Sequence, residues 1–117
     1  MTKYNAKRTT VDGITFASQK EARRYQELKL LERAGFITDL ELQPKFEFIV
    51  HGKPVLIRSK GFPNGRKASY RADFRYFCLK RKESIVEDAK SVATRTEADV
   101  LRRAIVEAIY VVRVEEV

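Results

Sequence analysis

Hydrophobic and polar residues alternate in two neighbouring runs of the chain, residues 70–77 and 84–90. Side chains of a strand point alternately to the two faces of a sheet, so both runs predict β-strands. The polar stretch 80–83 between them predicts the loop of a β-hairpin. On the second strand Asp88 and Lys90 share one face, while Glu87 lies on the other.

The number of residues in the hairpin loop decides which acid meets Asp73 of the first strand. An even number places Asp73 on the face of Asp88 and Lys90, opposite Asp88 for a loop of two and opposite Lys90 for a loop of four. An odd number brings Glu87 to Asp73 instead, and Glu87 is then the substitute metal ligand. Paired carboxylates bind hard divalent cations such as Mg²⁺, and a nearby lysine can stabilise charge on a phosphate. The alternative is a salt-bridge cluster on a solvated hairpin.

Two other segments have helical character. Ser18 and Glu21 have the spacing of a capping box, and Gly35 is expected to end a helix over residues 18–34. A second capping pattern at Thr96 begins a helix that runs to Tyr110, and its apolar stripe is expected to face the core: Val100, Leu101, Ala104, Ile105, Ala108 and Ile109. The helix leads into residues 111–114, which favour a parallel strand reached by a right-handed crossover.

Short strands are predicted at 37–42, 45–50 and 54–57. Residues 58–68 combine glycine, proline and basic side chains, which predicts an exposed, mobile loop placed to touch a phosphate backbone.

Composition narrows the classes of partner. The 117 residues suffice for one domain, and the net charge of +8 with a pI near 9.8 indicates a polyanion. The single Cys78 and single His51 exclude a disulfide scaffold and a zinc site of cysteines or histidines. Without an apolar run of membrane length or a signal-like N-terminus, a soluble cytoplasmic protein is expected. The basic side chains expected to bind this polyanion are Arg58, Lys60, Arg66, Lys67, Arg71, Arg102 and Arg103.

The order of helix, strands, acid-bearing hairpin, helix and strand resembles the PD-(D/E)XK nuclease core. The triplet Asp88-Ala89-Lys90 matches its acid-any-lysine motif. Four further segments resemble short phage proteins related to Holliday junction resolvases, and they lie at residues 3–7, 11–16, 18–25 and 40–46. The resemblance implies one nuclease-like α/β domain over 1–117, with a mixed central β-sheet flanked by helices.

The resemblance also implies residue roles. Asp73 and Asp88 would hold Mg²⁺, or Mn²⁺ in its place, with the backbone carbonyl of Ala89 as a possible third ligand. Lys90 would position the attacking water. Ala72 stands where the motif name has proline, and that proline carries no chemistry.

Nucleases of this resolvase-like type use a glutamate near the start of the first helix, which would be Glu21 here. The other interpretation of Glu21 is a helix cap with Ser18, and the sequence leaves both open. The implied activity is hydrolysis of phosphodiester bonds in phage DNA, on branched or junction structures, by a homodimer that makes two symmetric cuts. Two alternatives remain: a non-catalytic module that binds DNA or a host protein, and a nicking or end-processing nuclease without junction preference.

Overall fold

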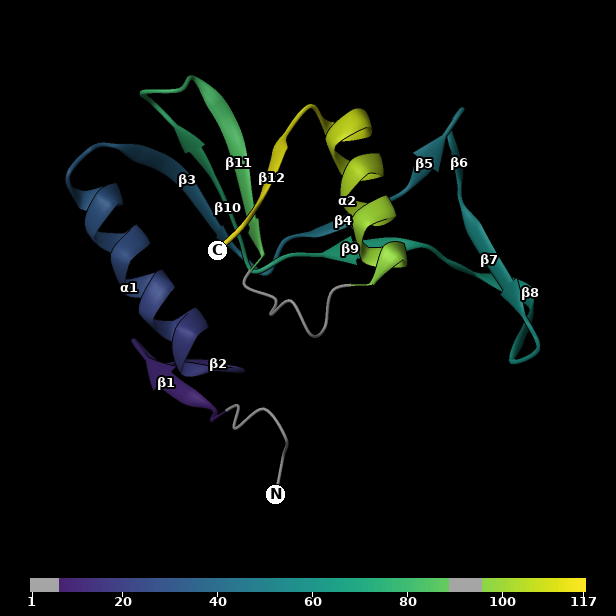
Figure 1. Cartoon of the computed structure of the whole chain (residues 1–117), viewed down its shortest axis with the longest axis horizontal. Coiled ribbons are helices and arrows are strands. Elements are labelled where there is room, and N and C mark those ends of the chain that lie inside the picture. The colour runs from purple at the N-terminus through teal and green to yellow at the C-terminus, as the bar shows by residue number, and fades with distance from the viewer. Residues whose placement is uncertain (1–6, 89–95) are drawn as a thin grey trace.

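The computed structural model describes residues 7–88 and 96–117, which form a mixed α/β structure (Figure 1). In chain order the elements are β1 (Thr9–Val11), β2 (Ile14–Phe16), α1 (Gln19–Arg33), β3 (Ile37–Leu42), β4 (Lys45–Glu47), β5 (Ile49–Val50), β6 (Lys53–Pro54), β7 (Leu56–Ser59), β8 (Phe62–Lys67), β9 (Ser69–Arg71), β10 (Phe74–Cys78), β11 (Glu83–Asp88), α2 (Glu97–Tyr110) and β12 (Arg113–Glu116). Neither of these helices is long and apolar enough to cross a membrane.

The central sheet of the described part has four strands in the order β12-β11-β10-β3. Strand β10 runs antiparallel to both β3 and β11, whereas β12 follows α2 and pairs parallel with β11. The prediction of a parallel strand after the second helix is confirmed. It begins later than expected, because Val111 adopts a left-handed conformation (φ 53°) at the end of α2.

The β10–β11 hairpin has the predicted even-length loop. Cys78 pairs with Glu83, so the loop comprises the four residues 79–82, one residue earlier than the expected 80–83. The regular pairing ends at Phe74 and Glu87, because the Asp73 amide donates to the carbonyl oxygen of Glu87 instead of continuing the register. Asp73 therefore lies outside the ladder of β10 with β11. The odd-length alternative, which would have brought Glu87 to Asp73, is wrong.

Both helices begin where their capping residues predicted. The Oγ of Ser18 accepts a hydrogen bond from the Glu21 amide at 3.1 Å, and the Oγ1 of Thr96 accepts one from the Asp99 amide at 3.1 Å. Helix α1 ends at Arg33, one residue before the expected Ala34, which is its C-cap.

The expected core-facing stripe of the second helix is largely wrong. Val100 and Leu101 are 51% and 61% exposed, whereas Val106, which was not assigned to the stripe, is fully buried. The buried side also carries Asp99 and, at helical spacing from Val106, the half-buried Arg103 and Tyr110. The inward side of α2 therefore combines the apolar Val106 with Arg103 and Tyr110, which have partners on β12 and β4.

The central sheet separates two hydrophobic clusters, each covered by one helix (Figure 1). Alternation along β11 sends Ile85 to the α1 side and Val86 to the α2 side. The α1 cluster consists of Phe16, Ala22, Tyr25, Leu28, Ile37, Phe74, Tyr76 and Ile85. The α2 cluster consists of Phe46, Phe48, Ala68, Tyr70, Ala72, Val86, Val106 and Val112.

The segment expected to be a mobile loop, 58–68, is mostly a β-hairpin. Leu56 pairs with Lys67, Ile57 with Arg66 and Ser59 with Phe62, so β7 and β8 form an antiparallel ladder closed by a two-residue turn. The prediction of a loop is wrong because turn-forming residues such as Pro63 and Asn64 lie within β8.

The strand expected at 70–77 is also interrupted. Strand β9 pairs with β4, and β10 pairs with β3 and β11, so the chain changes partners at Ala72 and Asp73. Asp73 consequently lies at the point where the central sheet gives way to the β4–β9 ribbon.

Candidate functional site

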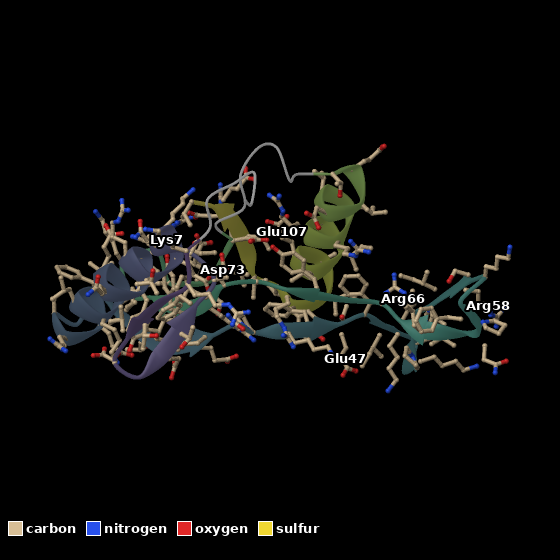
Figure 2. The ribbon with its side chains drawn as sticks, turned by 90° about the horizontal axis from the view of Figure 1, so that it is seen from below. Lys7, Glu47, Arg58, Arg66, Asp73 and Glu107 are labelled. Atoms are coloured by element: carbon tan, nitrogen blue, oxygen red, sulfur yellow. The ribbon has the colours of Figure 1, made fainter. Side chains whose placement is uncertain are left out.

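A pocket of about 280 Å³ brings together three acidic side chains that are far apart in the sequence. Asp73 comes from the break between β9 and β10, Asp88 from the end of β11, and Glu21 from the first turn of α1. The remaining lining residues are Ala17, Ser18, Gln43, Arg71 and Ala72. The position of Asp73 near the middle of the molecule is seen in Figure 2.

The backbone around Asp73 is held on both sides. Its amide donates to the carbonyl oxygen of Glu87 at 3.0 Å, and its own carbonyl accepts from the Gln43 amide at 2.8 Å. These bonds tie the break to β11 and to the end of β3. The carboxylate of Asp73 is therefore presented from a fixed backbone although it lies outside a strand.

The Asp88 carboxylate is held by a tyrosine on the adjacent ribbon. Asp88 is 2% exposed, and its Oδ2 accepts a hydrogen bond from the hydroxyl of Tyr70 at 2.5 Å. Burial, together with this hydrogen bond, raises the pKa of Tyr70 well above its ordinary value. Tyr70 therefore stays protonated and continues to donate. Its role is missing from the sequence prediction, since only the register of β4 and β9 brings it to Asp88.

Glu21 lies in the first turn of α1, and its side chain points toward the end of β3. Glu21 is 5% exposed, and its carboxylate accepts a hydrogen bond from the side-chain amide of Gln43 at 3.4 Å. The cap with Ser18 uses the backbone amide of Glu21 and leaves this carboxylate for other contacts. Gln43 has φ 49°, an uncommon conformation for glutamine, and such residues cluster at functional sites. Gln43, which directly follows the strand predicted at 37–42, is thus a further residue of the site.

Glu87 lies on the opposite face of β11 from Asp88 and does not line this pocket. It is 1% exposed, and its two carboxylate oxygens accept from Nε and Nη2 of Arg24 at 2.7 Å each. The hydroxyl of Tyr76 also donates to Glu87, at 2.5 Å. The hydrogen bond to Glu87 raises the pKa of Arg24, and burial with a hydrogen bond to Glu87 raises that of Tyr76. Glu87 therefore anchors α1 to the sheet.

The donor set of the pocket suits a hard cation. Its carboxylate and amide oxygens are the ligands that Mg²⁺ prefers, and Mg²⁺ is usually held by one or two carboxylates plus water and substrate oxygens. In the described residues no group of three or more His, Cys, Asp or Glu side chains is close enough to hold a metal alone. Asp73 and Asp88 thus fit a magnesium site completed by other ligands. Ala89, the possible third metal ligand, and Lys90, the residue predicted to position the attacking water, lie outside the described residues.

The predicted DNA-binding side chains fall into two groups. Arg58, Lys60, Arg66 and Lys67 are exposed on the β7–β8 hairpin, and Arg71 is exposed beside the pocket.

The other group, Arg102 and Arg103 on α2, makes ion pairs within the protein. Arg102 lies 3.7 Å from Asp99, and Arg103, with a side chain only 14% exposed, lies 3.4 Å from Glu116. These two arginines are therefore partly neutralised within the protein, unlike the hairpin cations in the described part of the chain.

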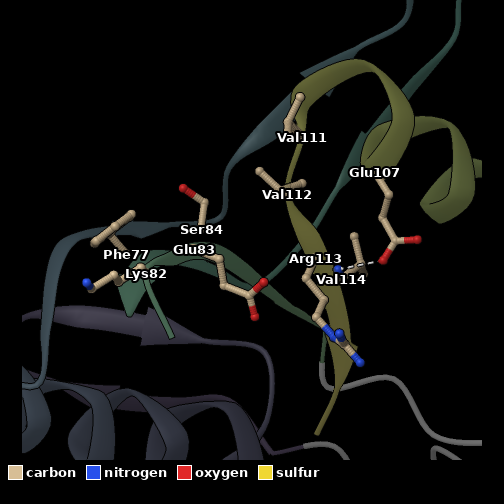
Figure 3. A pocket seen from close by; sticks show the side chains of 9 residues that line it. All are labelled: Phe77, Lys82, Glu83, Ser84, Glu107, Val111, Val112, Arg113 and Val114. Atoms are coloured by element: carbon tan, nitrogen blue, oxygen red, sulfur yellow. Dashed lines mark hydrogen bonds between the residues drawn. The ribbon is translucent and has the colours of Figure 1, made fainter. Parts of the chain in front are cut away.

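A larger pocket, of about 660 Å³, lies near the start of β11 and β12, at the other end of these strands from Asp88 (Figure 3). Three of its four charged lining residues have partners: Glu107 accepts from the Val114 amide at 3.0 Å, Glu83 pairs with Arg81, and Arg113 approaches Glu115. The larger pocket is therefore not the better candidate site. The smaller pocket, which gathers three acidic side chains, is the better candidate.

Comparison with protein families shows which family the chain belongs to. A family model described as "Protein of unknown function (DUF1064)" matches residues 1–114. The chain belongs to the DUF1064 family. No curated protein and no solved structure matches this DUF1064 chain.

Proposed function

We propose that this protein is a divalent-metal-dependent endonuclease that hydrolyses phosphodiester bonds of DNA. The observation that carries the proposal is the convergence of Asp73, Asp88 and Glu21 on one pocket from three separate elements. Carboxylate oxygens gathered around one pocket are the ligands that a hard divalent cation prefers.

The arrangement of the central sheet supports the proposal. Strands β3, β10 and β11 are antiparallel neighbours, and β12 is added in parallel after α2. This order agrees with the PD-(D/E)XK core that the sequence resembles, in which the first acid comes from one strand and the acid-any-lysine triplet from the next. In this proposal Asp73, next to β10, and Asp88, at the end of β11, would take these two roles.

Each side chain of the pocket has a role in hydrolysis. Asp73 and Asp88 would hold the Mg²⁺, and Tyr70 orients Asp88 by donating to it. Mg²⁺ lowers the pKa of water and offsets charge on the phosphate. Arg71, exposed beside the pocket, is placed to bind a substrate phosphate. In the reaction a water oxygen attacks phosphorus, and the bond from phosphorus to the leaving sugar oxygen breaks.

Within this proposal the substrate is branched or junction DNA of a phage, cut in the host cytoplasm by a homodimer. The support is the sequence resemblance together with the net charge of +8. A binding module without activity and a nicking or end-processing nuclease are the competing functions. The experiment below separates all three.

Cleavage is expected to require Mg²⁺ or Mn²⁺ and to stop in excess chelator, because the pocket offers oxygen ligands suited to these ions. The measurement is incubation of the protein with labelled duplex, single-stranded, flap and four-way DNA, with and without each ion. Preferential cutting of branched DNA supports the full proposal, and equal cutting of nicked duplex or ends supports the end-processing nuclease. Binding without cleavage under every condition supports the non-catalytic module, and undiminished cutting in chelator contradicts the metal dependence.

Glu21→Gln is expected to slow cleavage by about a hundredfold while the melting temperature stays near that of the wild type. The substitution removes the charge at the pocket but keeps the backbone amide that bonds to Ser18. The measurements are single-turnover cleavage and thermal unfolding of the same preparation.

Ser18→Ala is the matched control for the cap. It removes the acceptor of the Glu21 amide and should lower the unfolding free energy by about 1 kcal/mol, with the metal dependence of cleavage unchanged. A stable Glu21→Gln protein that cuts at the wild-type rate would leave Glu21 as a structural residue only.

A further inference from the structure

The segment between Glu47 and Asp73 contains no acidic residue. Over residues 48–72 the sequence has six lysines and arginines and not one aspartate or glutamate, although the whole chain has 16 acids. The six are Lys53, Arg58, Lys60, Arg66, Lys67 and Arg71. A large part of the net charge of +8 is thus concentrated in one continuous segment.

Most of this segment forms a projection, which we call the β-arm and define as residues 49–67, strands β5 to β8. Figure 1 shows the β-arm extending away from the central sheet beyond α2. The radius of gyration is 15.9 Å, whereas a compact domain of this length is expected at about 13 Å. The difference is consistent with an element that does not fold back onto the body.

The cations of the β-arm are not neutralised by the described part of the chain. No carboxylate there lies within ion-pair distance of Arg58, Lys60 or Lys67, in contrast to the paired Arg24 and Arg81 of the body. Exposed cations without internal partners are available for an external polyanion.

The tip of the β-arm has a defined geometry. The guanidinium of Arg66 lies over the ring of Phe62 with 6.0 Å to the ring centroid, which orients the arginine. Gly65 has φ 90°, and a Cβ at this position would come within 2.9 Å of the Leu56 Cβ across the ladder. Glycine is therefore needed for the close pairing of β7 and β8. The cations are carried by a paired ribbon, so little backbone conformational entropy is lost when they bind.

The β-arm leads directly into the candidate site through β9 and Arg71. Figure 2 shows Arg66 and Arg58 toward one end of the molecule, with Asp73 nearer its middle. An extended strand rises about 3.3 Å per residue, so the turn at Lys60 can lie up to about 40 Å from Asp73. The longest dimension of the molecule is 47 Å. This reach is comparable to one turn of B-form DNA, about 34 Å.

We propose that the β-arm binds the phosphate backbone of a double-stranded DNA flank about one helical turn from the pocket. The distance from the bound DNA flank to a cut site rests on the proposed function, whereas DNA binding by the β-arm does not. The affinity of the protein for DNA should therefore depend on the length of duplex beside the pocket.

A second copy of the chain is the competing occupant of the β-arm. Several of its apolar side chains are exposed, namely Ile49, Val50, Val55, Leu56 and Phe62. Two arms with the same excess of positive charge repel each other, whereas DNA is attracted. The charge therefore favours DNA over self-association.

The first test compares two triple variants that remove the same charge. Arg58→Gln, Lys60→Gln and Lys67→Gln change the β-arm and keep Arg66 on Phe62. Arg33→Gln, Lys80→Gln and Lys82→Asn change exposed cations of the body away from the pocket, with asparagine chosen because Lys82 has φ 53°. Affinity for a duplex of about three helical turns is measured in chelator at several salt concentrations.

In this test the β-arm triple should bind at least about tenfold more weakly at low salt and lower the slope of log K against log salt by about 2 to 3. The body triple should keep the wild-type slope. Equal losses in both triples, or wild-type binding by the β-arm triple, would overturn the proposal. Because no cleavage is measured, this result is independent of whether the protein is a nuclease.

The second test varies the length of DNA. Four-way junctions with arms of about 6, 10, 14 and 20 base pairs are bound in chelator, and wild-type affinity should rise up to about one helical turn and then level off. The β-arm triple should lose this dependence. A wild-type affinity that does not change with the length of the junction arms would contradict the proposed contact one helical turn from the pocket. A dimer that dissociates in Leu56→Ser, combined with wild-type DNA binding by the β-arm triple, would assign the β-arm to self-association instead.

Discussion

Asp88→Asn is expected to slow DNA cleavage by about a thousandfold or more while the protein stays folded and keeps its affinity for DNA. Asp88 is buried beside the pocket, and asparagine retains an oxygen that can accept from Tyr70. The change removes the charge that would hold the metal, whose contribution of several kcal/mol corresponds to about this factor in rate. Affinity should be unchanged or tighter, because a negative charge near phosphate is lost.

The measurement is single-turnover cleavage at saturating protein, with affinity determined separately in chelator. Asp39→Asn is the matched control: Asp39 is exposed on β3, and its φ of 58° is one that asparagine tolerates. It should cut at the wild-type rate. Normal cutting by Asp88→Asn would remove Asp88 from the mechanism and with it the proposed function of the pocket.

Arg24→Ala is expected to lower the free energy of unfolding by about 3 to 5 kcal/mol, because it leaves the carboxylate of Glu87 buried without its cation. Glu87 is nearly inaccessible to water, and Arg24 supplies two hydrogen bonds of 2.7 Å to it. Tyr76 still donates to Glu87 but brings no positive charge. Urea denaturation measured at neutral pH gives the difference.

Arg23→Ala is the matched control on the same helix. Arg23 is exposed, so its loss should change the unfolding free energy by less than about 0.5 kcal/mol. Replacing both Arg24 and Glu87 by methionine should recover most of the loss, since neither partner then leaves an unpaired buried charge at this position. An Arg24→Ala protein as stable as Arg23→Ala would show that this ion pair does not hold α1 to the sheet.

Helix α2 shows where a local hydrophobic pattern fails to identify the side that faces the core. Val100, Leu101, Ala104 and Ala108 form a regular stripe, yet all four are exposed. Val106 is buried instead, on a side shared with the polar Asp99 and Arg103. Hydrophobicity summed along a helix cannot detect that Arg103 has an ion-pair partner on β12, 13 residues away.

Local sequence determined the features that depend on short-range periodicity and capping. Ser18 and Gly35 fixed the extent of α1, and strand alternation placed Glu87 and Asp88 on opposite faces of β11. Non-local pairing decided the rest, because its energy depends on partners that are distant in the chain. The register of β4 with β9 brings Tyr70 to Asp88, the end of β3 brings Gln43 to Glu21, and Arg24 of α1 holds Glu87 away from the pocket. Likewise the basic segment became a ribbon, since the pairing of β7 with β8 outweighed the turn preference of its proline, asparagine and glycine residues.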